Sequence, residues 1–420
     1  MGKLLFLVRR SLGQHMLSTV VTVLATGLAA GLVMAVFSLS AQTRTAFAGG
    51  DLGFDAVLGA RGSQLQLVLN TVFHLETSPG NIPYSLYKDI KGDPAIEMAI
   101  PYALGDNYEG FRIVGTTEEI FRFEYREGER FRLRQPGRAF NSQFAEAVIG
   151  SRVADRTGLK PGDRFFPTHG VTPDGVVHDR DEFLVVAVME PTNSPSDRVI
   201  WIPIEAFFRI GGHYLANEKG EHYEPKDVET IPDEHKELSA VMLRFRGRAP
   251  MTGMRLSQRI NRSGKVATLA WPLDGVMGEL FDKLGWVTRV LQLVAYLVVL
   301  VAIGSILASL YNTMNERRRE FAILRALGAR RATVFSAIVA ESAAIAVLGA
   351  LIGYVFYWLI LTLAAVVVKQ QTGVVVEVMA FHPILIKTPI AMIVLGAAAG
   401  LLPAAKAYRT DVASNLVPQT

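Results

Sequence analysis

Residues 315–331 read NERRREFAILRALGARR and lie between two long apolar runs. The stretch carries six arginines and only two acidic residues. Because loops on the cytoplasmic side of a membrane concentrate Lys and Arg, this composition predicts a cytoplasmic location. Its apolar residues recur at helical spacing, which predicts a short amphipathic helix. The apolar stripe consists of Phe321, Ile323, Leu324 and Leu327.

Gly328 follows this stripe at the position where a glycine would end a helix. A stop-transfer signal needs only positive charge, so it explains neither the stripe nor the glycine. We therefore interpret the stretch as an interaction helix. Its apolar side needs a partner, which is either the membrane or a second protein.

Four apolar runs are long enough to cross a bilayer, which takes about 20 residues. They are Leu17–Leu39, Val290–Leu310, Val334–Val368 and Ile384–Leu402, and a mostly polar stretch of residues 41–286 separates the first two. The first run follows Arg9 and Arg10, as a signal peptide would. It is longer than the usual apolar core of about 7–15 residues, so we expect an uncleaved anchor.

The charges predict the orientation of the chain. Residues 41–286 carry 29 basic and 34 acidic residues, whereas the rest of the chain carries 14 basic and five acidic ones. The excess of basic residues therefore flanks the membrane runs and does not indicate a nucleic-acid partner. With four spans, both termini are expected in the cytoplasm and the polar stretch outside it. The chain has no cysteine, which excludes disulfides and thiolate metal sites.

The polar stretch has the pattern of a mixed α and β domain. We predict strands at 111–115, 183–188, 200–204 and 240–246, and helices at 85–91 and 145–157, the latter with some strand character at 147–149. The sequence Lys160–Asp163 predicts a turn. Residues 205–245 could form a second lobe. From Met277 the apolar spacing becomes helical and leads directly into the second span, which predicts a helical stalk.

The predicted fold is an α-helical membrane protein with four transmembrane helices and a mixed α+β extracytoplasmic domain between the first two. The expected segments are 1–47 (cytoplasmic N-terminus, first span and stalk), 48–276 (extracytoplasmic domain), 277–311 (stalk and second span), 312–333 (cytoplasmic helix), 334–368 (third span), 369–383 (outer loop) and 384–420 (fourth span and cytoplasmic tail).

Three of the spans contain two glycines four residues apart, which lets helix backbones approach closely. Such pairs predict tight packing within one chain or between two copies, although glycine is also simply common in membrane helices. The pairs are Gly27/Gly31, Gly349/Gly353 and Gly396/Gly400.

Glu341 is an acidic residue inside the third run. Ionisable groups within a membrane are candidates for function by default. Glu341 follows the arginine-rich stretch by only about three helical turns, so a structural position near the cytoplasmic interface is the stronger interpretation.

The sequence contains no Gly-x-x-x-x-Gly-Lys-Ser/Thr, Gly-x-Ser-x-Gly or His-Glu-x-x-His motif. We therefore expect no ATPase or hydrolase activity from this chain alone. His213, His222 and His235 lie in an acidic polar stretch and could bind zinc, but their spacing matches no compact motif. A solvated loop is the simpler interpretation, and no metal site is predicted.

Residues 315–329 closely resemble the coupling helix of FtsX-like/MacB-type ABC transporter permeases. Residues 340–353, which include Glu341, are similar to the start of that family's third span, and 400–411 are similar to its C-terminal end. Residues 147–163 and 183–204 resemble its periplasmic core domain, whereas 205–245 have no counterpart that we can name.

The resemblance implies a subunit of the bacterial cytoplasmic membrane that pairs with a second copy or a paralogue. It implies a separate dimeric ABC ATPase that holds ATP and magnesium, with no cofactor in this chain. The apolar stripe would fill a groove of that ATPase. The charged rim of this contact would consist of Glu316, Arg317, Arg318, Arg319 and Glu320. Gly328 would lie at the end of the coupling helix. The family role of Glu341 is open.

The expected function is to couple ATP hydrolysis in the partner to shape changes of the outer domain. The expected cargo is a lipoprotein, lipid, peptide or amphiphilic drug at the outer face, with a periplasmic adaptor or substrate-binding protein as a further partner. Two alternatives stay open, namely control of a periplasmic cell-wall hydrolase and zinc-linked transport.

Overall fold

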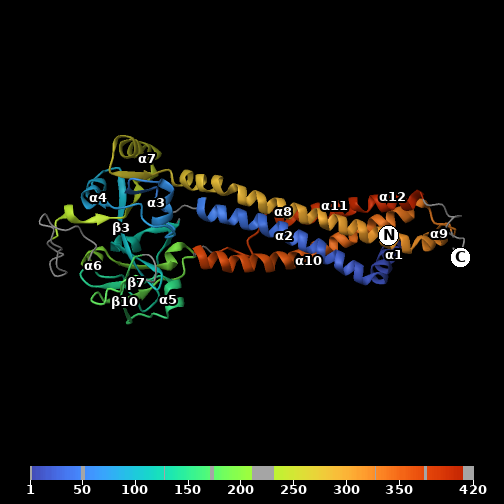
Figure 1. Ribbon diagram of the computed structural model, residues 1–420, viewed down its shortest axis with the longest axis horizontal. Coiled ribbons are helices and arrows are strands. Elements are labelled where there is room, and N and C mark those ends of the chain that lie inside the picture. The colour runs from blue at the N-terminus through green and yellow to red at the C-terminus, as the bar shows by residue number, and fades with distance from the viewer. Residues whose placement is uncertain are drawn as a thin grey trace. The chain divides into compact units, whose positions relative to one another are not determined.

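A computed structural model describes residues 2–48, 53–126, 128–170, 175–210, 231–326, 328–372 and 376–409. The chain divides into two compact units. Unit 1 comprises Met1–Thr43, Leu284–Val367 and Val376–Thr420, and unit 2 comprises Arg44–Lys283 and Val368–Val375. Unit 1 contains the long apolar helices, and unit 2 contains the sheet (Figure 1).

The long helices match the apolar runs of the sequence. Four segments are long and apolar enough to cross a membrane, as predicted: Met16–Arg44, Gly285–Met314, Arg331–Gln370 and Ile384–Tyr408. The helices that contain or flank them are α1 (Gly2–Gln14), α2 (Met16–Ala48), α8 (Leu273–Glu316), α9 (Arg318–Ala326), α10 (Arg331–Thr372), α11 (Ile384–Ala399) and α12 (Leu401–Arg409). The helix expected from Met277 therefore begins four residues earlier, at Leu273.

The glycine pairs of α2 and α10 face each other within one chain. A Cβ atom added at Gly31 would lie 2.8 Å from the Gly353 carbonyl oxygen and 2.5 Å from Phe356 Cβ. One added at Gly27 would lie 3.1 Å from the Gly349 oxygen. Only a residue without a side chain permits this approach, and the register shows that the two helices run parallel.

The third glycine pair packs on the same helix. A Cβ atom at Gly396 would lie 2.4 Å from Ala346 Cβ, and one at Gly400 would lie 2.1 Å from Ser342 Oγ. Helix α10 is thus in close contact with α2 and with the α11–α12 segment. Small residues line both contacts, because backbones can approach only where side chains are short.

Unit 2 is built on a mixed ten-stranded sheet with the strand order β14-β1-β13-β3-β4-β11-β7-β10-β8, and β9 pairs with β3. The strands are β1 (Ala56–Ala60), β3 (Ile96–Tyr108), β4 (Phe111–Thr116), β7 (Glu146–Ile149), β8 (Arg164–Phe165), β9 (Thr168–His169), β10 (Phe183–Val188), β11 (Val199–Pro203), β13 (Ala240–Phe245) and β14 (Ala267–Ala270). Two small sheets pair β2 (Ile82–Pro83) with β12 (Glu237–Leu238), and β5 (Glu124–Arg126) with β6 (Glu129–Arg130).

The central strands are buried on both faces. In β11, Ile200 and Ile202 belong to one apolar cluster, whereas Val199 and Trp201 belong to the other. This alternation follows from the two-residue period of a strand. Five helices complete the described part of the unit: α3 (Gln64–Thr71), α4 (Tyr84–Lys91), α5 (Ser151–Thr157), α6 (Ile204–Arg209) and α7 (Pro250–Ser257).

The sequence predicted four of these strands, the helix at 85–91 and the turn at 160–163 correctly. The helix predicted for 145–157 is wrong in its first half. Residues Glu146–Ile149 form β7, which pairs with β10 and β11, and the helix begins only at Ser151. Pairing with strands distant in sequence overrides the local helical pattern. The described part of 205–245 forms no separate lobe, because β13 pairs with β1 and β3.

We predict that Gly31→Leu weakens the bundle, because its side chain would enter the backbone of α10. Overpacking of this kind costs about 1–3 kcal/mol. Gly304→Leu on α8 is the matched control, since a Cβ atom there meets nothing within 4 Å. Melting of the full-length protein in detergent measures both. Equal melting temperatures of the two variants would contradict the packing described here.

We also predict a pH dependence that originates at His74. Burial and the nearby Arg112 and Arg198 lower the pKa of His74 from 6.5 to about 3. The unfolded chain therefore binds a proton that the folded chain does not, so stability falls as pH drops from 6.5 towards 3. The loss is at most about 1.4 kcal/mol per pH unit.

The variant His74→Asn is the appropriate comparison, because asparagine tolerates the positive φ of 54° at this position. Melting temperatures of the wild type and the variant should show parallel pH dependence above pH 6.5. Below it, the wild type should lose stability faster. Parallel curves down to pH 4.5 would rule out the contribution of His74.

Candidate functional site

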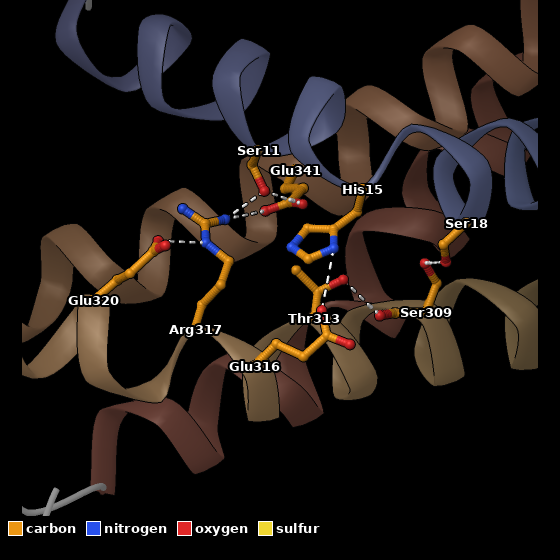
Figure 2. Close-up of polar contacts among 9 residues, drawn as sticks. All are labelled: Ser11, His15, Ser18, Ser309, Thr313, Glu316, Arg317, Glu320 and Glu341. Carbon is orange, nitrogen blue, oxygen red and sulfur yellow. Dashed lines mark hydrogen bonds and ion pairs between the residues drawn. The ribbon is translucent and has the colours of Figure 1, made fainter. Parts of the chain in front are cut away.

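Two short breaks between helices lie at the same end of unit 1. Helix α1 ends one residue before His15 and α2 begins one residue after it, and Arg317 separates α8 from α9 in the same way. Each break lets the chain turn and brings a polar side chain towards α10. Figure 2 shows the resulting cluster, to which α1, α2, α8, α9 and α10 contribute.

The centre of the cluster joins three residues from three parts of the chain. Ser11 of α1 donates a hydrogen bond of 2.5 Å from Oγ to Glu341 Oε1 of α10. Arg317 Nη1 donates to the same Ser11 hydroxyl and lies 3.7 Å from Glu341 Oε2. Ser11 is 2% exposed, and Arg317 and Glu341 are each 8% exposed. Figure 2 shows all three side chains pointing towards one another.

Arg317 also holds the beginning of α9. Its Nε donates a hydrogen bond of 2.9 Å to Glu320 Oε2, and its guanidinium lies 5.2 Å from the centre of the Phe321 ring. The hydrogen bond from Arg317 lowers the pKa of Glu320, with further contributions from Gln14 and Arg10. One guanidinium therefore contacts α1, α9 and α10 together.

Weaker polar contacts surround this centre. His15 Nδ1 lies 3.2 Å from Glu316 Oε2, which links the first helix break to the end of α8. Ser18 and Ser309 share a hydrogen bond of 2.9 Å between their hydroxyls, which links α2 to α8. The His15 and Ser18 contacts with α8 follow one another in the direction away from Arg317 (Figure 2).

The energetics favour keeping the centre intact. Buried charges are costly unless they are paired and hydrogen-bonded, so Arg317 and Glu341 each depend on the other. Removing one partner of such a pair typically costs about 3–5 kcal/mol. A small cavity of about 60 Å³ lies beside the pair and is lined by Val8, Phe321 and Ile338 among others. The site is a set of buried polar contacts that join α1, α9 and α10 at Arg317.

The structure revises the role predicted for one rim residue. Arg317 was expected at an exposed charged rim, but it is buried because it neutralises Glu341. Glu316 and Glu320 are exposed, as a rim requires, and Ile323 is 44% exposed. Phe321 is half-buried against α10 and α12, so part of the predicted apolar stripe packs within this chain.

The remaining residues of that helix are described less fully. Helix α9 includes Arg318, Arg319 and Leu324, but the structure describes only their backbone. Leu327 lies outside the described residues. Gly328 has a φ of +97°, the left-handed conformation of a helix-ending glycine. Contact of α9 with an ATPase stays a prediction.

Glu341 lies in the polar cluster, and its position near the cytoplasmic interface stays a prediction. Ser11 and His15 were not predicted, because a single hydroxyl or imidazole before an apolar run carries no signal in the sequence. Of the three histidines considered for zinc, His213 and His222 lie outside the described residues, and His235 ends a short 3-10 helix, Asp233–His235. A different group in unit 2 has metal-ligand geometry, formed by Asp106, His169 and His178.

Comparison with known proteins agrees with this architecture. The model of the MacB-like periplasmic core domain matches residues 19–245, and that of the FtsX-like permease C-terminal region matches 293–412. The periplasmic region of MacB from Actinobacillus actinomycetemcomitans is 11% identical, with a TM-score of 0.33 over 55% of this chain and 95% of that one. The extracellular domain of the noncanonic ABC-type transporter YknZ from Gram-positive bacteria is 14% identical, with a TM-score of 0.29 over 51% and 98%. No curated protein matches significantly.

Four apolar helices with a mixed α and β domain between the first two define a multi-pass membrane protein with a periplasmic domain. The MacB-like model covers more than half of the chain, so the chain belongs to the FtsX-like permeases that carry a MacB-like periplasmic core domain. Permeases of this family work with an ABC ATPase partner.

We predict that Arg317→Met and Glu341→Gln each destabilise the protein, because each leaves a buried polar group without its charged partner. Arg317→Met should cost about 3–5 kcal/mol, and Glu341→Gln less, since its amide still bonds Ser11. The double variant should lose clearly less than the sum, with a coupling of at least about 1 kcal/mol.

This double-mutant cycle compares the wild type, the two single variants and the double variant. Melting temperatures of the full-length protein in detergent measure all four. Arg330→Met is the control for loss of a guanidinium, because Arg330 is exposed in the same part of the chain. It should leave the melting temperature nearly unchanged. Additive losses in the double variant would show that Arg317 and Glu341 do not stabilise each other.

Proposed function

We propose that this chain is the membrane subunit of an ABC system and that its helix α9 receives motion from a separate ATPase. The ATPase binds ATP and magnesium, and this chain supplies the mechanical connection. The observation that carries the proposal is the position of Arg317, which lies at the end of α8 and contacts Ser11 of α1, Glu320 of α9 and Glu341 of α10.

These contacts determine how a push on α9 would spread. Displacing α9 alone would separate Arg317 from Ser11 and Glu341 and leave buried charges unpaired, which is costly. Moving α1, α8 and α10 together with α9 keeps every contact. Helix α8 is a single helix from Glu316 back to Leu273, and its first turns pack in the apolar core of unit 2 through Leu273, Val276 and Met277. It thus offers a continuous route for the motion.

We infer that the cargo is handled at the outer face of the membrane. The acidic and basic side chains of the four candidate spans lie near the span ends, with the exception of Glu341, which pairs with Arg317. Those near the ends are Arg44, Arg289, Arg331, Lys369, Lys387 and Lys406. Such spans offer a hydrophilic solute no polar path across the bilayer. A lipoprotein, lipid, peptide or amphiphilic drug that reaches the periplasmic domain suits this arrangement.

The same proposal includes orientation and assembly. The arginine-rich α9 region and both termini lie in the cytoplasm, by the distribution of Lys and Arg. Two ATPase subunits dock on two copies of this permease or on one copy and a paralogue. A periplasmic adaptor or substrate-binding protein delivers or accepts the cargo.

We predict that Ile323→Asp abolishes communication with the partner ABC ATPase. The change puts a charge on the exposed apolar part of α9, so docking should weaken and permease-stimulated ATPase activity should fall at least about tenfold, equivalent to about 1.4 kcal/mol. ATPase activity of the co-expressed complex in nanodiscs measures the effect.

Met251→Asp is the matched control, because Met251 is an even more exposed apolar side chain on α7 of unit 2. It should leave the stimulated activity unchanged, and both variants should melt at the wild-type temperature. Full stimulation and copurification with Ile323→Asp would eliminate α9 as the docking helix.

A further inference from the structure

Three metal-binding side chains meet on one edge of the sheet in unit 2. Asp106 belongs to β3, His169 belongs to β9, and His178 follows β9 in the chain. One potential ligand atom from each residue lies within 4.8 Å of the others. The Asp106 side chain is fully buried, whereas His178 is partly exposed and His169 is exposed. The group therefore has a buried anion and an access route from solvent.

The two distances to the Asp106 carboxylate fit one shared ion. His169 Nδ1 lies 3.3 Å from Asp106 Oδ1, and His178 Nε2 lies 3.5 Å from the same oxygen. Ligands at about 2.0–2.1 Å from a tetrahedral zinc ion lie about 3.3–3.4 Å from one another. Good hydrogen bonds from an N–H group are shorter, at about 2.9–3.0 Å. Both imidazoles thus lie around Asp106 at the spacing of metal ligands.

A second carboxylate lies near one of the imidazoles. Asp181 Oδ2 lies 3.9 Å from His178 Nδ1, the ring nitrogen that does not face Asp106. Metal-binding histidines commonly face a carboxylate with the nitrogen that does not bind the ion. Asp181 is close enough to take that place if an ion binds His178 Nε2.

The backbone around the group is well fixed. Asp106 and His169 are directly paired in the β3–β9 ladder. Asn107 Nδ2 donates hydrogen bonds to the carbonyl oxygens of Thr168 and Gly170, at 3.3 and 2.9 Å. The His178 amide donates to the Pro167 carbonyl at 2.8 Å. The ligands are therefore preorganised, which reduces the entropic cost of binding an ion.

We propose that Asp106, His169 and His178 form a binding site for a divalent transition-metal ion, with zinc as the best match. Two imidazoles and one carboxylate suit zinc, and three protein ligands leave one coordination position open. The ion would join β3 to the segment containing β9 and His178. This site is independent of the docking of α9 and of the histidines at 213, 222 and 235.

The test is zinc titration of the full-length protein in detergent after treatment with a chelator. We expect one saturable equivalent by calorimetry and a higher melting temperature with zinc. Cobalt should give the visible absorption of a tetrahedral site with nitrogen and oxygen ligands. His169→Ala should weaken zinc binding by more than about tenfold, and Asp181→Asn by about tenfold.

Two controls keep the result decisive. His169 is exposed, so His169→Ala should melt like the wild type without zinc, and its loss of binding would not reflect misfolding. A variant with alanine at positions 213, 222 and 235 should keep the full zinc affinity. Absence of a saturable site in the wild type, or unchanged affinity of His169→Ala, would overturn the proposal. Loss of binding only in the triple variant would place the metal in the 211–236 stretch instead.

Discussion

A buried guanidinium has to be neutralised, and in this protein Arg317 meets that requirement by joining helices that are distant in sequence. Its partners come from α1 and α10, and the third contact is with Glu320 of the adjoining helix α9. The break between α8 and α9 lies at Arg317 itself, and the break between α1 and α2 lies next to Ser11. The positions of four helices at this end of unit 1 therefore depend on one charged group.

The glycine contacts and the charged cluster act together on α10. Gly349 and Gly353 bring α10 against α2 so closely that their backbones touch, and this contact sets the parallel register of the two helices. Glu341 lies two turns before Gly349 on the same helix, so the packing helps to present it to Ser11 and Arg317. Close packing of the helices thus positions Arg317 and Glu341, and the attraction between these two residues is electrostatic.

The two units differ in how far the sequence could predict them. The apolar runs predicted the membrane helices well, because in lipid a chain must satisfy its backbone hydrogen bonds within each segment. In unit 2 four strands were recognisable from the sequence. Residues 145–157 pattern mainly as helix, with some strand character at 147–149, and residues 146–149 form β7 because β10 and β11 pair with them. Within the candidate site, the sequence predicted the amphipathic helix that carries Ile323 and singled out Glu341 as an acidic residue inside an apolar run. The burial of Arg317 was not, because its partners Ser11 and Glu341 lie far from it along the chain.

The sequence by itself determined the four spans, the domain between the first two, the charged amphipathic α9 and the family to which these features point. Each follows from composition or local period, which a linear chain displays directly. Only the tertiary structure decided that the glycine pairs meet within one chain, that Arg317 faces inward, and that Asp106 meets His169 and His178. Those outcomes depend on which distant segments become neighbours, and neighbours are set by packing and strand pairing across the whole fold.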